Sequence, residues 1–217
     1  MATSPRYPVL VPATSSERTG ERPYHHGNLR AALLDAAEAG LRERGADQLS
    51  LRELARQVGV SHAAPRRHFP DRQALLDALA VAGFDRLGAE LRAAIAEAGE
   101  DFAARLGAAA AAYARFATRD VALLDLMFTA KHQRGSESVV AAAGVSMAVV
   151  FELIAEGQEA GVLEAGDLYQ VGTILFATIQ GIVTFVNGAL VPPDMLDGLV
   201  ETAVEQFLRG SRRAAVD

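Results

Sequence analysis

The chain has 217 residues, of which half are apolar and 6% aromatic, and its 27 acidic side chains outnumber its 21 basic ones. It contains no cysteine, which excludes disulfides, thiol chemistry and cysteine-ligated metal sites. Because it has only eight prolines and no regular alternation of apolar and polar residues, we predict an all-α fold.

The charge is divided unevenly along the chain. Residues 1–72 hold 11 Arg and 8 acidic side chains, a net charge of +3, whereas residues 73–217 hold 10 basic and 19 acidic side chains, a net charge of −9. This division favours a basic domain over 24–72, suited to an anionic partner, and an acidic second domain over 73–217.

The chain that precedes the first strong motif has two parts. Residues 1–23 are polar and rich in proline and serine, so we expect a disordered arm. They lack the apolar run of a signal peptide, which together with the absence of cysteine suits a cytoplasmic protein. A first helix is then predicted over 29–44, and Gly45 is expected to end it.

A helix-turn-helix is predicted in the segment SLRELARQVGVSHAAPRRHFPDR. Ser50 can cap its first helix, and Glu53 three residues later completes a capping box. Gly59 can take the positive φ of a sharp turn. Ser61 can then cap a second helix over 62–68.

The second helix of this motif has the donors needed to enter the major groove of DNA. Contacts from this helix are expected at Ser61, His62, Ala63, Arg66, Arg67 and His68. Contacts to the DNA backbone are expected from Tyr24, His25, Arg52 and Arg72. Arg72 stands at a helix start, where amide dipoles attract phosphate.

A long helix is predicted to follow the motif over about 72–97. Phe69 is expected to fill the core of the three N-terminal helices, and Asp71 to cap the long helix. Five more helices are then predicted, for a total of about nine. The first has an apolar stripe that begins at Phe102, and the others cover 121–132, 136–160, 168–190 and 193–210.

The segment 168–190 carries no charge over 23 positions and by length alone could cross a membrane. However, Gln170, Gln180 and Asn187 would be costly in lipid, and the flanking residues are acidic rather than basic. A helix that is apolar on all sides also suits a soluble dimer, because one face meets the body and the other the partner. The alternative interpretation is a membrane-associated protein. Whether the purified chain stays soluble without detergent would distinguish the two interpretations.

A small-molecule site is predicted in the helical body, where aromatic, methionine and a few polar side chains occur together. The candidates are Phe84, Tyr113, Phe116, Met127, Phe128, His132, Met147, Phe151, Phe176, Gln180 and Thr184. Aromatic and methionine residues at helical spacing are equally typical of plain core, so both interpretations stay open. The polar members are the most informative, because buried polar groups need partners.

The sequence has no signature of catalysis or metal binding. It lacks a nucleophile elbow, a P-loop and a paired-carboxylate pattern, and its histidines lack ligand spacing. We therefore expect neither an enzyme nor a cofactor.

Three segments resemble the N-terminal domain of the TetR family of transcriptional regulators. They are YHHGNLRAALLDAA (24–37), LSLRELARQVGVS (49–61) and HFPDRQALLDAL (68–79). The resemblance covers about residues 24–90. It implies a three-helix DNA-binding domain with a helix-turn-helix, followed by a larger helical domain for ligand binding and dimerisation.

The segment LGAAAAAYARFATRDVALLDLMF (106–128) resembles the start of the C-terminal domain in the subgroup named for a Trp-His-Gly motif. The matching place is Ile179-Gln180-Gly181, where only the glycine fits. Functions tied to the other two residues of that motif are therefore in doubt.

Arg66 is a second departure from the family. The family usually has an aromatic residue there, most often a tyrosine that touches a DNA phosphate. Arg66 can bind a phosphate through its charge or reach a guanine edge, and a solvent-facing side chain is the third alternative.

The resemblance implies a homodimer in which the last two helices of each subunit form a four-helix interface. The expected interface residues are Ile174, Gly181, Ile182, Phe185, Leu199, Ala203 and Phe207. We expect a sequence-specific repressor that binds a palindromic operator in double-stranded DNA and is released by a small, largely apolar effector. The alternative is a helical small-molecule-binding protein or enzyme with a vestigial DNA-binding domain.

Overall fold

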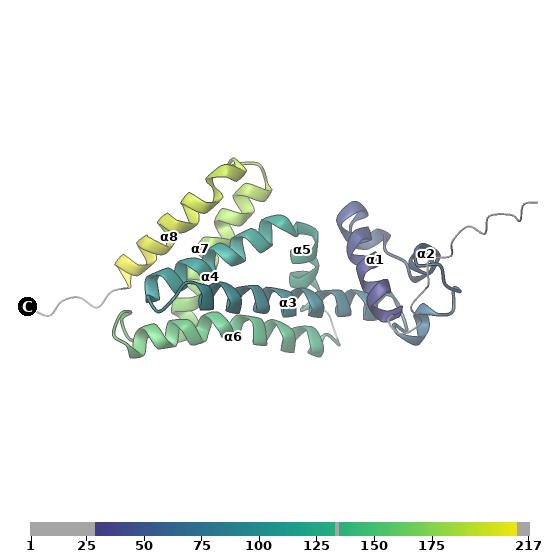
Figure 1. The fold of residues 1–217 in the computed structure, drawn as a ribbon, viewed down its shortest axis with the longest axis horizontal. Coiled ribbons are helices and arrows are strands. Elements are labelled where there is room, and N and C mark those ends of the chain that lie inside the picture. The colour runs from purple at the N-terminus through teal and green to yellow at the C-terminus, as the bar shows by residue number, and fades with distance from the viewer. Residues whose placement is uncertain (1–28, 133–134, 212–217) are drawn as a thin grey trace, which may run out of the picture.

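The computed structural model describes residues 29–132 and 135–211. Over these residues the chain forms eight α-helices and three short 3-10 turns, with no strand, so the all-α prediction is confirmed. The helices form an elongated molecule with a small N-terminal unit (residues 29–71) at one end and a helical body at the other (Figure 1). Residues 1–23, predicted to be a disordered arm, lie outside the described residues.

The N-terminal unit is built around one aromatic side chain. Helices α1 (Leu29–Arg44) and α2 (Leu51–Gln57) pack with the start of α3 (Arg72–Glu97). Phe69 is 2% exposed, and the Arg30 guanidinium lies 5.5 Å from the centre of its ring. The predicted role of Phe69 in the core of this unit is therefore confirmed.

Local signals in the sequence position these helices. Gly45 and Gly59 have φ of 79° and 74°, which an L side chain would resist, and each follows a helix as predicted. The Ser50 hydroxyl accepts a hydrogen bond from the Glu53 amide at 3.2 Å. The reciprocal half of the capping box is replaced, because the Glu53 carboxylate accepts from Arg56.

The prediction of a second helix over 62–68 is wrong. The segment forms only a 3-10 turn at Pro65–Arg67. Pro65 has no N–H, so it cannot make the hydrogen bond to a carbonyl four residues earlier that an α-helix requires, and it is buried in the unit. The cap predicted at Ser61 also differs, since its backbone carbonyl rather than its hydroxyl accepts from the Ala64 amide.

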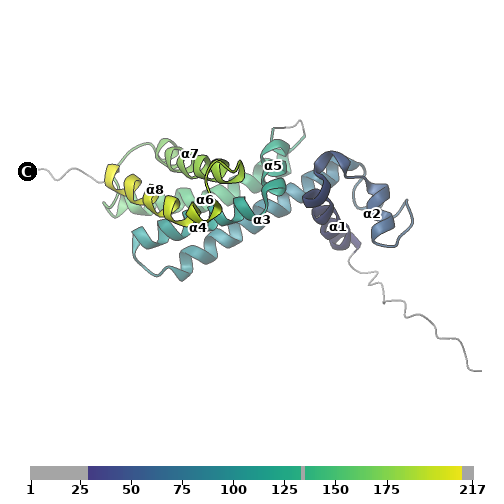
Figure 2. The ribbon, with the colours of Figure 1, turned by 90° about the horizontal axis from the view of Figure 1, so that it is seen from above.

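The body contains all five predicted helices. They are α4 (Phe102–Arg119), α5 (Val121–Ala130), α6 (Glu137–Glu159), α7 (Leu168–Asn187) and α8 (Leu196–Gly210). The predicted start of the last helix is instead a 3-10 turn, Pro193–Met195, and α7 ends three residues earlier than expected. The Asp71 carboxylate caps α3 by accepting from the Ala74 amide at 2.8 Å. From there α3 runs into the body, where α6 lies alongside it and α7 and α8 pack over α4 (Figures 1 and 2).

Two body helices, α6 and α7, are long and apolar enough to cross a membrane by length and composition alone. Core helices of soluble proteins meet the same test. Helix α7 leaves large apolar side chains uncovered within one subunit, since Ile174 is 56% and Phe185 53% exposed. The outer face of α7 is therefore apolar and exposed to solvent within one subunit.

Replacing Phe69 by alanine is expected to lower the free energy of unfolding by roughly 3–5 kcal/mol, because it leaves a cavity in the centre of the small unit. Chemical denaturation followed by circular dichroism measures the loss. Tyr169→Ala is the control, because this ring is 72% exposed and should cost far less. Equal losses in the two variants would contradict the role of Phe69.

Candidate DNA-binding surface and ligand cavity

Seven of the ten predicted DNA contacts are exposed at the N-terminal end of the molecule (Figure 1). They are Arg52, Ser61, His62, Ala63, Arg66, Arg67 and His68. Tyr24 and His25 lie outside the described residues. The remaining contact, Arg72, is half-buried.

Three arginines at this end have no acidic partner among the described residues. Within the part of the chain that the structure describes, Arg52, Arg66 and Arg67 form no ion pair, whereas Arg56 pairs with Glu53 at 2.5 Å. An unpaired guanidinium is free to bind a phosphate or the edge of a guanine. These three arginines can therefore bind a polyanion without first breaking an ion pair within the described part of the chain.

Arg72 has internal partners. Its Nε donates to the Leu49 carbonyl at 3.0 Å, and its Nη2 donates to the Ala46 carbonyl. These bonds hold the turn before α2 against the first residue of α3. Its predicted contact with a DNA phosphate stays a prediction, and the side chain already serves to orient α2.

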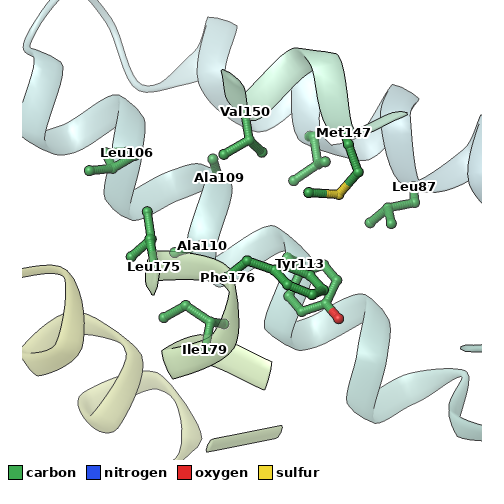
Figure 3. A pocket seen from close by; sticks show the side chains of 11 residues that line it. Leu87, Leu106, Ala109, Ala110, Tyr113, Met147, Val150, Leu175, Phe176 and Ile179 are labelled. Atoms are coloured by element: carbon green, nitrogen blue, oxygen red, sulfur yellow. The ribbon is translucent and has the colours of Figure 1, made fainter. Parts of the chain in front are cut away.

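The body contains a small apolar cavity between α3, α4, α6 and α7. Its volume is about 40 Å³, against roughly 300–1,000 Å³ for typical ligand pockets. Figure 3 shows the side chains of these helices converging on it. They are Leu87, Leu91, Leu106, Ala109, Ala110, Tyr113, Met147, Val150, Leu175, Phe176 and Ile179. The cavity in this conformation suits only a small apolar group, so a larger ligand requires the helices to move apart.

Three of the predicted ligand residues line this cavity: Tyr113, Met147 and Phe176. The Tyr113 and Phe176 rings meet edge to face with centres 5.3 Å apart. The Tyr113 hydroxyl donates to Oε1 of Gln180, which joins α4 to α7 beside the cavity. Burial raises the pKa of Tyr113, so this phenol stays protonated and remains a donor at neutral pH.

The other predicted ligand residues lie elsewhere. Phe84, Phe116 and Met127 are buried in packed core, where the Met127 sulfur fills the space beside Gly83. The remaining aromatic residues, Phe128 and Phe151, pack against Phe176 and Tyr169. Thr184 and His132 are exposed, so the interpretation of His132 as a buried polar group is wrong.

Eight residues that line the cavity were not predicted as ligand contacts, and all of them are aliphatic or alanine. The only sequence signal for them lies in α4, where the small residues Ala109 and Ala110 are both buried on the side that faces the cavity. Two small residues side by side leave room that their neighbours do not fill.

The predicted dimer residues divide by exposure. Ile174 and Phe185 are exposed, whereas Gly181, Ile182, Leu199 and Phe207 are half-buried. Ala203 is 8% exposed and lies among the residues by which α8 packs on its own subunit, so it does not belong to the open face.

Comparison with known families gives two matches. Residues 33–79 match the bacterial regulatory proteins of the tetR family, and residues 106–207 match the C-terminal domain of tetracyclin-repressor-like proteins. No curated protein matches the chain.

Solved structures with this fold include one at substantial identity. A protein from a Rhodococcus species, described as having unknown function, is 46% identical, with 89% of this chain and 100% of that chain covered and a TM-score of 0.83. The TetR family transcriptional regulator PfmR from Thermus thermophilus is 20% identical, with 83% and 99% covered and a TM-score of 0.65.

The regulator FadR from Bacillus subtilis, in complex with stearoyl-CoA, is 18% identical, with 83% of this chain and 98% of that chain covered and a TM-score of 0.70. At such identity the similarity to PfmR and FadR shows a shared fold.

Replacing Tyr113 by phenylalanine is expected to lower the free energy of unfolding by about 1–3 kcal/mol, because Oε1 of Gln180 loses its donor in a largely buried place. Thermal and urea unfolding measure the effect. The double variant Tyr113→Phe with Gln180→Leu should recover part of the loss, because both polar partners are then absent. A double variant that only adds the two single losses would show that the bond does not join the helices.

Proposed function

Because the chain belongs to the TetR family of bacterial regulatory proteins, we propose that it is a sequence-specific DNA-binding transcriptional regulator that acts as a repressor. The observation that carries the proposal is the exposed N-terminal motif, in which the guanidinium groups of Arg52, Arg66 and Arg67 have no ion-pair partner among residues 29–132 and 135–211. Binding to DNA places the protein in the cytoplasm, and α7 is then a dimer helix rather than a membrane span.

The proposed DNA contacts are those of the exposed turn, together with Arg52, Arg72, Tyr24 and His25. A 3-10 turn is shorter than a recognition helix, so it brings only a few side chains to the base edges at a time. Arg66 and Arg67 are adjacent and exposed in that turn, next to the buried Pro65. One of the two can bind a phosphate while the other reads a base.

The proposed homodimer is supported by the outer face of α7. Ile174, Gly181 and Phe185 recur at intervals of seven and four residues and so share one face of the helix. Beyond its chain neighbours and the backbone of its own helix, a Cβ added at Gly181 would meet no atom of the described residues within 4 Å, so the backbone there is open to close approach by another helix. Two copies joined in this way would present two motifs to successive major grooves of a palindromic operator.

The proposed effector is a small, largely apolar molecule that enters the cavity beside Tyr113. Because the present cavity is far smaller than such a ligand, binding would favour a conformation with the surrounding helices further apart. If that conformation holds the two motifs at a spacing that does not match the operator, effector and DNA binding oppose each other by linkage.

In vitro selection from random duplex DNA with the purified full-length protein tests the proposal. Enrichment of an inverted repeat is the expected result and would also supply the operator. A folded, soluble protein that enriches no sequence at low salt would contradict the proposal and favour a small-molecule-binding protein with a vestigial motif.

Arg67→Ala is expected to weaken binding to the selected operator by about 1–3 kcal/mol, because it removes a guanidinium from a base or a phosphate. Fluorescence anisotropy at two salt concentrations measures the change. The matched control is Arg209→Ala, since Arg209 is an exposed arginine of α8 in the body. An effect no larger than that of the control would remove Arg67 from the contacts.

Phe185→Glu is expected to separate the dimer, because it places a charge in the centre of the proposed interface. Light scattering at micromolar concentration should give the mass of one chain for this variant and of two chains for the native protein. The matched control is Val140→Glu, because Val140 is equally exposed, at 53%, but lies on α6. Dimers in both variants would contradict the proposed interface.

A further inference from the structure

A buried carboxylate links the N-terminal unit to the body. Asp120 lies between α4 and α5, and its side chain is 2% exposed. Its Oδ1 accepts from Arg42 of α1, from Nη2 at 2.7 Å and from Nε at 3.1 Å, and its Oδ2 accepts from Nε of Arg119 at 2.9 Å. Burial would raise the pKa of Asp120, but the two guanidinium groups outweigh it and hold the pKa below its usual value. The carboxylate is therefore ionised at neutral pH.

The use of this carboxylate is unusual for its position. Asp120 immediately precedes α5, where an aspartate commonly caps the helix by accepting from an amide of the first turn. Its side chain makes no such cap, because both oxygens are taken by arginines. An interaction that would stabilise α5 alone is thus replaced by one that joins α1 to the end of α4.

Further ion pairs surround this contact. Glu38 of α1 accepts two hydrogen bonds from Arg86 of α3, at 2.8 and 3.0 Å, and also accepts from Arg42. Arg119 in turn donates to Glu90 of α3 at 2.9 Å. The cluster contains three arginines and three acids, so it is balanced in charge, and the loss of one arginine leaves an excess negative charge among partly buried side chains.

The same helix that carries this contact lines the cavity. Tyr113 and Asp120 are seven residues apart on or at the end of α4, about 10 Å along its axis. Helix α7 is joined to α4 beside the cavity through Gln180 and near Asp120 through Asn187, whose Nδ2 donates to the Ala117 carbonyl at 3.2 Å. A displacement of α4 by a group in the cavity would therefore be transmitted to Asp120.

We propose that Asp120 is a positioning residue for DNA binding, which holds α1 and the motif behind it in register with the helix that lines the cavity. The inference rests on the proposed function. A groove of about 350 Å³ between the N-terminal unit and α5 leaves space for a change in the unit's orientation when the contact opens. The groove is lined by Gly45, Asp47, Arg72, Asp125 and Thr129 among others.

The first experiment removes the arginine rather than the buried acid. The Arg42 side chain is 49% exposed, so Arg42→Gln should leave the fold intact. We expect operator affinity to fall roughly tenfold, within the range usual for linked sites. Arg44→Gln is the matched control, because it removes the same charge from the same turn of α1, and Arg44 pairs only with the adjacent Glu43 among the described residues. Equal affinities for the two variants would overturn the proposal.

A second experiment separates positioning from a general structural role. Ala110→Leu overfills the cavity and is expected to lower operator affinity by moving α4. When Ala110→Leu is combined with Arg42→Gln, the loss of operator affinity should be no greater than in the more affected single variant. The reason is that Arg42→Gln has already opened the contact with Asp120. Losses that multiply would show that the cavity and the contact act independently. Ala109→Val is the substitute if Ala110→Leu does not fold.

Hydrogen–deuterium exchange distinguishes failure of this inference from failure of the proposed function. Arg42→Gln should raise exchange in α1 and α2 relative to Arg44→Gln, whether or not the protein binds DNA. If the native protein selects no DNA sequence but exchange rises, the proposed function fails while Asp120 still positions the N-terminal unit. If exchange is unchanged, the contact does not hold the unit in place.

Discussion

The architecture depends on one continuous helix, α3, which belongs to both parts of the molecule. Its 26 residues extend for about 39 Å without an interruption. At its start, Arg72 binds the carbonyls before α2, and further along Leu87 and Leu91 line the cavity. Helix α3 contains no proline that would kink it, so a tilt imposed at the cavity would be expected to change the orientation of the N-terminal unit. The ion cluster at Asp120 adds a second connection, and together the two define the angle of the unit.

The parts of the fold that the sequence predicts correctly are those with local causes. Capping side chains at Ser50 and Asp71, glycines with positive φ, and apolar residues at helical spacing each act within a few residues of themselves. The prediction of a second helix in the motif is wrong for an equally local reason. Its capping and turn signals are present, but Pro65 in its middle removes a donor and limits the segment to a 3-10 turn.

The cavity and the ion cluster have no local cause, and for this reason they could not be predicted. Whether a phenylalanine lines the cavity depends on which helices lie opposite it. Phe116 of α4 is buried in packed core, whereas Phe176 of α7 lines the cavity. Arg42 and Asp120 are 78 positions apart, and nothing near either residue indicates a partner. The exposed face of α7 was predictable, because a helix with apolar residues on every side needs cover on every side.

The near-closure of the cavity has a consequence for sensitivity. A protein whose binding-competent state is rarely populated shows an apparent affinity reduced by the fraction of time that this state exists. The dose at which such a regulator responds is then a property of how tightly α3, α4, α6 and α7 close, as well as of what the ligand touches. Substitutions at the helix contacts, remote from any bound molecule, would shift the response threshold while leaving the choice of ligand unchanged. In the proposed regulator, mutations at these helix contacts could therefore change the sensitivity to the effector during evolution without changing which effector binds.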